Sequence, residues 1–218
     1  MLDVLLPQRC VACGATGEQV CERCLTRLPR IAGPLCTRCG APTAWPVERC
    51  RECTGRRLAF ASARAAVEYD AAVKALVSAW KERGLRRLAD VASALVEETV
   101  QRPEAATLAF IPPDGDRSVK RGHHPAERLA RELGKRWGLP VVPLLARTRT
   151  LPAQRGLSLV ERRRNVRNAF RATRKPPSTV VLVDDVYTTG STVGAAASAL
   201  RKAGARRVGV VTFARAVR

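Results

Sequence analysis

The chain has 218 residues, a length that suits one ordinary domain with a small additional module. Hydrophobic residues make up 46% and aromatic residues 4%, which predicts a globular protein whose core is filled mainly by Ala, Val and Leu. Lys and Arg number 39 against 19 Asp and Glu, and this formal charge of +20 favours polyanionic partners such as nucleic acid or phosphate-rich ligands. The alternative is an Arg-rich composition whose charges are only solvated.

Membrane insertion is excluded by the absence of any stretch of about 18 apolar residues, the length that a spanning helix needs. The first seven residues, MLDVLLP, lack the basic start, the long apolar stretch and the cleavage site of a secretory signal peptide. We therefore expect a cytoplasmic protein with no membrane insertion.

All eight cysteines fall within the first 53 residues, in four Cys-x2-Cys pairs. The pairs are Cys10 and Cys13, Cys21 and Cys24, Cys36 and Cys39, and Cys50 and Cys53. Each such turn lets two thiolates reach one tetrahedral ion, and two turns complete a four-sulfur structural site. We predict two structural zinc ions in a double zinc ribbon over residues 1–57. The short loops between pairs favour quartets that are consecutive in the sequence, while interleaved quartets stay open. Disulfides are the disfavoured alternative.

Beyond residue 57, apolar residues alternate between helical and strand-like spacing. Apolar residues at helical spacing predict helices over 73–80, 88–96, 125–137 and 191–203. Apolar runs predict strands at 108–111, 179–183 and 208–211, and a weaker strand signal lies at 141–142. Pro125 is expected to open the third helix, and Gly138 and Gly204 to end the third and fourth. Apolar strands separated by helices indicate a parallel sheet covered on both faces. We therefore predict an α/β domain over residues 58–218.

The segment from 180 to 192 carries the clearest functional signal, because a buried strand there leads into a polar loop and then a helix. The strand brings Asp184 and Asp185 to its carboxyl end, the edge at which open α/β sheets bind ligands. Such carboxylates suit ribose hydroxyls or a magnesium shell. The N–H groups at a helix start hold phosphate. The loop adds hydroxyls and one glycine that permits close approach, namely Thr188, Thr189, Gly190, Ser191 and Thr192. A loop that merely caps the helix is the alternative, and it needs fewer such residues.

From Arg147 to Lys175 the chain has ten basic residues and one acidic residue, Glu161. A long connection of this kind suits a lid over pyrophosphate or a track for a nucleic-acid backbone, and we favour a phosphate-facing role for part of it. The two histidines, His123 and His124, lie just before the third predicted helix. A place at the helix start or in a pyrophosphate loop is the favoured interpretation, and a general base is the alternative.

The strand, the two aspartates and the Thr-Thr-Gly-Ser-Thr loop resemble the ribose-phosphate signature of type I phosphoribosyltransferases. With the cysteine module, the chain resembles the ComF family over nearly its whole length. Further matching pieces are Tyr69-Asp70, Lys81, Arg121-Gly122, Leu129-Ala130, Gln154, Leu157-Ser158, Glu161-Arg162, Asn165 and Ala169-Phe170. After Arg121-Gly122 the family normally has Phe-Asn-Gln, whereas this chain has His123-His124-Pro125, so no role carries over for those Asn and Gln side chains.

The resemblance implies a type I phosphoribosyltransferase-like sheet that binds phosphoribosyl pyrophosphate (PRPP) together with Mg²⁺. Asp184 and Asp185 would bracket the ribose hydroxyls at the catalytic centre, and the loop from Thr188 to Thr192 would wrap the 5′-phosphate. The loop over 111–121 would face the pyrophosphate, with Arg117, Lys120 and Arg121 as its cations.

The family also implies transfer of the phosphoribosyl group and a link to DNA uptake in natural transformation. The alternative is a non-enzymatic adaptor. In that case the zinc ribbon and the basic surface bind single-stranded DNA or a helicase partner, and the phosphate loop senses a nucleotide-like ligand.

Overall fold

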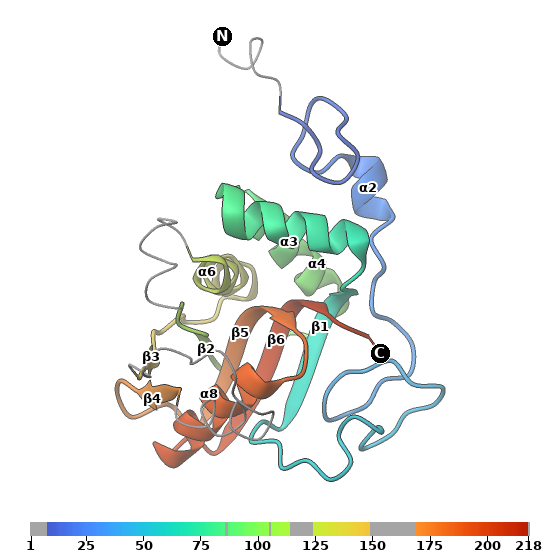
Figure 1. Ribbon diagram of the computed structural model, residues 1–218. Coiled ribbons are helices and arrows are strands. Elements are labelled where there is room, and N and C mark those ends of the chain that lie inside the picture. Colours follow the sequence, from blue (N-terminus) through green and yellow to red (C-terminus); the bar gives the residue numbers. More distant parts are fainter. Residues whose placement is uncertain (1–7, 86, 105, 114–123, 149–168, 218) are drawn as a thin grey trace, which may run out of the picture.

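The computed structural model describes residues 8–85, 87–104, 106–113, 124–148 and 169–217. Its centre is a four-stranded sheet in the order β1-β6-β5-β2, in which every pair of neighbours is parallel (Figure 1). The strands are β1 (Ser62–Glu68), β2 (Thr107–Phe110), β5 (Thr179–Tyr187) and β6 (Arg207–Arg215). A small antiparallel pair, β3 (Leu145–Arg147) and β4 (Phe170–Ala172), lies apart from this sheet. The predicted α/β fold with a parallel sheet is confirmed.

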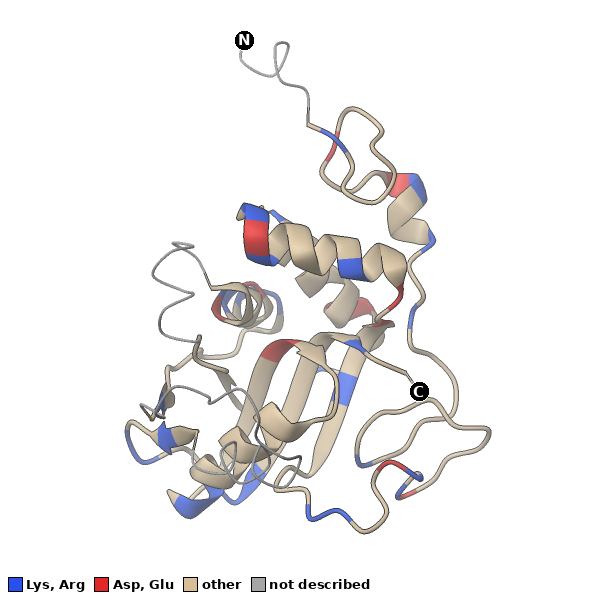
Figure 2. Cartoon of the chain, viewed as in Figure 1, with Lys and Arg blue, Asp and Glu red and all other residues tan. Residues whose placement is uncertain are grey.

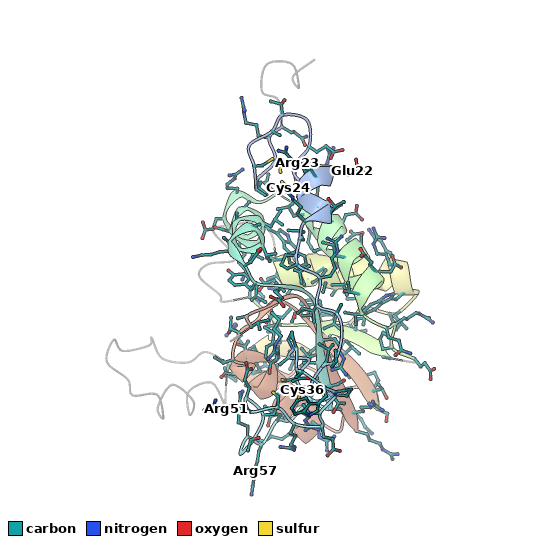
Figure 3. All side chains as sticks on the ribbon, turned by 90° about the vertical axis from the view of Figure 1, so that its right-hand side faces the viewer. Glu22, Arg23, Cys24, Cys36, Arg51 and Arg57 are labelled. Atoms are coloured by element: carbon teal, nitrogen blue, oxygen red, sulfur yellow. The ribbon has the colours of Figure 1, made fainter. Side chains whose placement is uncertain are left out.

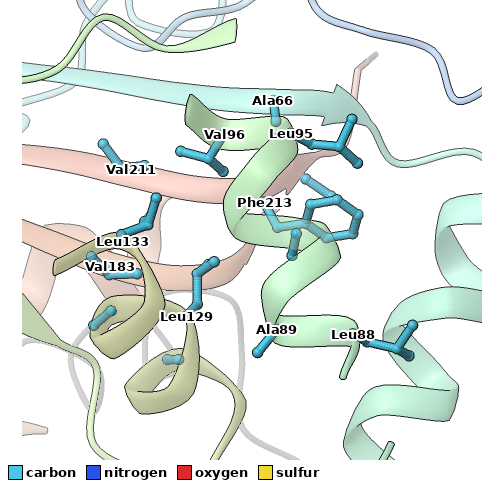
Figure 4. Close-up of a cluster of buried hydrophobic side chains, with 14 of the residues drawn as sticks. Ala66, Leu88, Ala89, Leu95, Val96, Leu129, Leu133, Val183, Val211 and Phe213 are labelled. Carbon is cyan, nitrogen blue, oxygen red and sulfur yellow. The ribbon is translucent and has the colours of Figure 1, made fainter. Parts of the chain in front are cut away.

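Helices cover both faces of the sheet, because the strands are apolar on both sides. One face carries α3 (Ala71–Arg83), α4 (Leu88–Thr99) and α6 (Pro125–Trp137), and the other carries α8 (Ser191–Lys202). Along β5, Val181 and Val183 pack toward the first group of helices, while Val180 and Leu182 pack toward α8. Figure 4 shows the first face, where side chains of α4 and α6 meet those of β5 and β6. All four predicted helices are present.

The strand predictions differ from the structure in three places. The short strands β3 and β4 are not predicted from the sequence. Neither is β1, whose alanines form no run of β-branched residues, although most of it is buried and it pairs with β6. The weaker signal at 141–142 gives only an isolated bridge between Val141 and Leu108. Pro140 precedes this bridge, and since proline has no N–H to donate, the ladder cannot extend beyond it toward the start of β2.

The cysteine-rich segment spreads along the α/β domain in two parts, which we call the first knuckle (residues 8–28) and the second knuckle (residues 34–57). The first knuckle contains the short helix α2 (Glu22–Thr26), and its Val20 and Leu28 join the core beside α3 and α4. Residues 29–31 then pair along the free edge of β1, with Ile31 N donating to Ala66 O at 2.8 Å. The second knuckle packs into the core on the α8 side, so the two knuckles contact opposite faces of the sheet (Figure 1).

The division of the chain at residue 57 stays a prediction. In the part of the chain that the structure describes, no helix is both long enough and apolar enough to span a membrane.

Candidate functional site

The cysteines form two clusters, each with its four sulfur atoms within 4.8 Å of one another. The first cluster is Cys10, Cys13, Cys21 and Cys24, and the second is Cys36, Cys39, Cys50 and Cys53. The quartets are therefore consecutive in the sequence and not interleaved. All eight thiols are free, so the disulfide alternative is not what the structure has.

Both clusters have the dimensions of a zinc tetrathiolate. In a tetrahedron with zinc–sulfur bonds of about 2.3 Å, neighbouring sulfur atoms lie about 3.8 Å apart. The observed separations are 3.7 Å for Cys13 and Cys21, 3.5 Å for Cys39 and Cys50, and 3.9 Å for Cys36 and Cys53. With all four positions filled by thiolates, each site suits a structural zinc ion.

The two cysteine clusters differ in burial. In the first knuckle Cys10 is buried, Cys13 is exposed, and Cys21 and Cys24 are only partly buried. In the second knuckle Cys36 and Cys53 have no exposed surface, Cys39 has 2%, and Cys50 is partly buried. The first knuckle projects beyond α3 near the N-terminus, whereas the second lies against the sheet (Figure 3).

Asp184 and Asp185 lie together at the carboxyl end of β5, where Figure 2 shows an acidic band. Asp185 is 8% exposed and forms an ion pair with Lys81 of α3, with 2.8 Å between Nζ and Oδ1. The half-buried Asp184 accepts a hydrogen bond from the Asp185 N–H at 2.9 Å. Burial and the neighbouring Asp185 charge raise the pKa of Asp184 to about 8, although Lys81 and Arg147 act in the opposite direction. The Asp184 carboxyl group therefore resists ionisation in the absence of a ligand.

The loop after β5 leaves its hydroxyl groups available to a ligand. Thr188 and Thr189 are exposed, and the Thr189 hydroxyl lies 2.9 Å from that of Ser191. Gly190 is the N-cap of α8 in a left-handed conformation, with φ of 71°, and as a glycine it offers no side chain to cap the helix. The Thr189 hydroxyl accepts the Ser191 N–H, the first N–H of α8, at 3.4 Å. Capping therefore accounts for one hydroxyl of the loop, which is fewer than the loop contains.

Two arginines that no sequence motif marks as site residues border this edge. Arg147 of β3 donates from Nε to the Pro112 carbonyl at 3.0 Å, and its guanidinium lies 4.8 Å from the centre of the Phe170 ring. Arg56, from the second knuckle, donates from Nη2 to the Thr189 carbonyl at 2.6 Å. Neither contact leaves a signal in the sequence, because the partners come from distant segments.

Several predicted site residues lie outside the described residues. These are Arg117, Lys120, Arg121, His123 and the whole of 149–168. His124 is described, and its Nδ1 accepts the Glu127 N–H at 3.2 Å as the N-cap of α6. The favoured interpretation of His124, a place at the helix start, agrees with this contact.

Comparison with known proteins agrees with the geometry of the cysteine clusters and of the α/β domain. Residues 1–54 match the double zinc ribbon domain, and residues 119–217 match the phosphoribosyl transferase domain. "Competence protein F" of Haemophilus influenzae is 28% identical over 95% of this chain and 97% of its own. "DNA utilization protein YhgH" of Salmonella typhimurium is 30% identical over 88% of each chain. "Competence protein ComFC" of Bacillus subtilis is 26% identical over 86% of this chain and 80% of its own. The chain belongs to the ComF family.

As a ComF protein, the chain combines a double zinc ribbon with a phosphoribosyltransferase domain. The match to that domain spans β5, the hydroxyl loop and α8, which together form the edge described above. Lys81 lies before the matched range, and the structure brings it to the same edge through α3.

Proposed function

We propose that this ComF protein binds PRPP, with Mg²⁺, at the carboxyl edge of its parallel sheet. The observation that carries the proposal is the meeting of three features at one edge. These are the adjacent carboxylates of β5, the exposed hydroxyl loop, and the start of α8, whose N-cap is Gly190. A sugar with a terminal phosphate needs acceptors for its hydroxyls and N–H donors for its phosphate, and this edge offers both.

Each part of the ligand has a partner in this arrangement. The 5′-phosphate accepts hydrogen bonds from the loop of residues 188–192 and from the first turn of α8. The ribose hydroxyls donate to Asp184 and Asp185. Lys81 holds Asp185 in place from α3, with its Nζ 2.8 Å from the carboxylate oxygen. Arg147 contributes positive charge close to Asp184. Lys120 and Arg121 remain the proposed cations for the pyrophosphate.

The oxygen ligands at this edge fit Mg²⁺, which prefers carboxylates and phosphate oxygens. When bound, the ion would neutralise pyrophosphate charge. In a transfer reaction, the bond between the anomeric carbon and the pyrophosphate oxygen breaks, and its electron pair leaves with pyrophosphate. The acceptor nucleophile supplies the pair for the new bond. The residues of the edge would orient the sugar and stabilise developing charge.

Titration calorimetry with PRPP and Mg²⁺ tests the binding site. The double change Asp184→Asn and Asp185→Asn should weaken binding by about tenfold or more, since it removes two charged acceptors. Asp90→Asn is the matched control, because Asp90 forms an ion pair with Arg136 on the outer surface of α4 and α6. A double variant that binds PRPP as tightly as the wild type contradicts the site. Pyrophosphate release in the same samples identifies a transferase, and binding without release identifies a sensor.

A second candidate function is single-stranded nucleic-acid binding by the second knuckle. Trp45 is 68% exposed, on the loop between Cys39 and Cys50. The exposed arginines Arg49, Arg51 and Arg57 follow it in the same knuckle, two of them labelled in Figure 3. An exposed aromatic ring beside cations is a stacking platform for bases. The names of the relatives, which refer to DNA utilization and competence, agree with this candidate.

Fluorescence anisotropy with a labelled oligonucleotide tests the second candidate. Trp45→Ala should weaken binding by about tenfold, in keeping with one stacked base, and Trp45→Phe should retain most of the affinity. The affinity should also fall steeply as salt is raised, because arginine contacts to phosphates release counterions. Equal affinity of Trp45→Ala and the wild type contradicts the candidate.

A further inference from the structure

A buried arginine joins the second knuckle to the sheet. Arg215, the last residue of β6, is 1% exposed. Its Nη1 donates to the Cys39 carbonyl at 2.7 Å, and its Nη2 pairs with Glu52 Oε2 at 2.8 Å. The same Nη2 lies 3.5 Å from the Cys39 sulfur. A buried guanidinium is unfavourable unless it is compensated by charge and hydrogen bonds. Here the second knuckle supplies the Cys39 carbonyl and the Glu52 carboxylate, while Nε has no hydrogen-bond partner among the described residues.

The guanidinium of Arg215 also lies over the ring of Tyr187, 4.6 Å from its centre. These two residues are direct partners in the pairing of β5 with β6. Tyr187 is 3% exposed, and the ring of Phe60 meets it edge-on with 6.3 Å between centres. Phe60 itself follows the second knuckle and has no exposed surface. The Tyr187 ring is therefore fixed from two sides.

Tyr187 in turn supports the phosphate loop. A Cβ atom added at Gly190 would lie 2.3 Å from the Tyr187 hydroxyl oxygen and 2.6 Å from Cζ, so the turn of the loop rests directly on this ring. A second contact comes from Arg56, which donates to the Thr189 carbonyl and, at 3.4 Å, to the Glu52 carbonyl. Two routes thus lead from the second knuckle to the loop.

We propose that the second knuckle, acting through Arg215 and Tyr187, holds the phosphate loop in the shape that binds the sugar phosphate. Arg215 and Tyr187 are positioning residues in this scheme, and loss of zinc from the second knuckle weakens ligand binding. The inference rests on the proposed function, because it concerns the regulation of that same site.

The physical basis is the geometry around Arg215. A bound zinc ion would hold the four cysteines of the second knuckle together, and so fix the Cys39 carbonyl and the Glu52 carboxylate at the guanidinium. Without zinc the knuckle loses this constraint, because small ribbons depend on the metal for their fold. Arg215 then loses its fixed partners, and the stacked Tyr187 loses a fixed neighbour. In the first knuckle no such link to the loop occurs among the described residues.

Two matched variants test the proposal. Glu52 lies between the cysteines of the last Cys-x2-Cys pair, and Glu22 lies between those of the second pair. Glu52→Gln should raise the Kd for PRPP with Mg²⁺ by about five- to tenfold, which is the lower range of coupling between two sites in a protein. Glu22→Gln is the control and should leave this Kd unchanged. Zinc content and far-ultraviolet circular dichroism check that both variants are folded and loaded. Equal Kd values for Glu52→Gln and the wild type overturn the inference.

A second readout needs no ligand. The chain has two tyrosines, Tyr69 and Tyr187, so ring-labelled tyrosine gives two assignable sets of NMR signals. Glu52→Gln, and Cys53→Ser with its loss of zinc, should move the Tyr187 signals, and Glu22→Gln should not. Tyr187 signals that stay in place in both variants overturn the inference. If the wild type binds no sugar phosphate while the Tyr187 signals move as expected, the coupling stands and the proposed function fails.

Discussion

The environment of Asp184 in the candidate ligand site lowers the stability of the folded protein when this carboxyl group is ionised. Its pKa is raised from 3.8 to about 8 because the carboxyl group is buried and lies beside Asp185. Between these two values the folded state keeps a proton that the unfolded state releases. The free energy of unfolding therefore falls as pH rises from about 4 to about 8 and then levels off. Strongly shifted carboxyl groups of this kind are typical of ligand sites.

Removing the Asp184 charge should therefore stabilise the free protein. Asp184→Asn is expected to raise the free energy of unfolding by about 1–3 kcal/mol at pH 8.5 and by less at pH 5.5, where the folded carboxyl group is already protonated. The amide oxygen can still accept the Asp185 N–H, so the local hydrogen bond is kept. Urea denaturation at the two pH values measures the difference, with Asp90→Asn as the exposed control. If Asp184→Asn raises the free energy of unfolding more at pH 5.5 than at pH 8.5, the raised pKa of Asp184 is contradicted.

Among single residues, those contiguous in sequence were predictable and those brought in by the fold were not. The pattern of a buried strand, two aspartates and a hydroxyl loop predicted the candidate edge from residues 180–192 alone. Lys81 was noticed only as a matching piece, and Arg147 only as part of a basic segment. Arg56 and Arg215 gave no signal, because their partners, Thr189 and Cys39, lie far away in the chain.

Helices were easier to predict than strands in this chain. In α3, α4, α6 and α8 the apolar residues recur at helical spacing on the buried face, so local sequence determines both the element and its orientation. The ends of β5 and β6 extend beyond their apolar runs, because ladder pairing carries Asp184 to Tyr187 and Thr212 to Arg215 into the sheet. Pairing with a partner is not visible in a local pattern, which is also why β1 was missed.

The two glycines of the α8 region should respond oppositely to the same substitution. Gly190→Ala is expected to destabilise by about 1–3 kcal/mol, because the added Cβ meets the Tyr187 ring and φ is 71°. Gly194→Ala should stabilise by roughly 0.5–1 kcal/mol, since nothing lies within 4 Å of its added Cβ and alanine favours a helix interior. Thermal denaturation measures both. A neutral Gly190→Ala would show that the loop does not rest on Tyr187.

Across the whole molecule, the double zinc ribbon is divided between the two faces of one sheet. The sequence predicts a separate zinc-ribbon module over residues 1–57, which would unfold on chelation and leave the α/β domain intact. The structure changes this expectation for the second knuckle, since Cys36, Cys39 and Cys53 belong to the same buried cluster as Leu182 and Leu200. Gly40 of this knuckle also packs closely against the start of β1. A Cβ atom added at Gly40 would lie 2.4 Å from the Ala63 carbonyl oxygen.

Zinc should therefore leave the protein in two steps. About two equivalents per chain are expected, with the exposed first knuckle losing its ion quickly and the buried second knuckle losing it slowly. The first step should lower the Tm little. The second should lower it strongly, because the structural zinc of a small ribbon contributes several kcal/mol to folding and this ribbon shares its core with the sheet. A colorimetric chelator followed over time, with Tm measured after each step, tests both statements. Release in a single phase, or less than one equivalent in total, contradicts them.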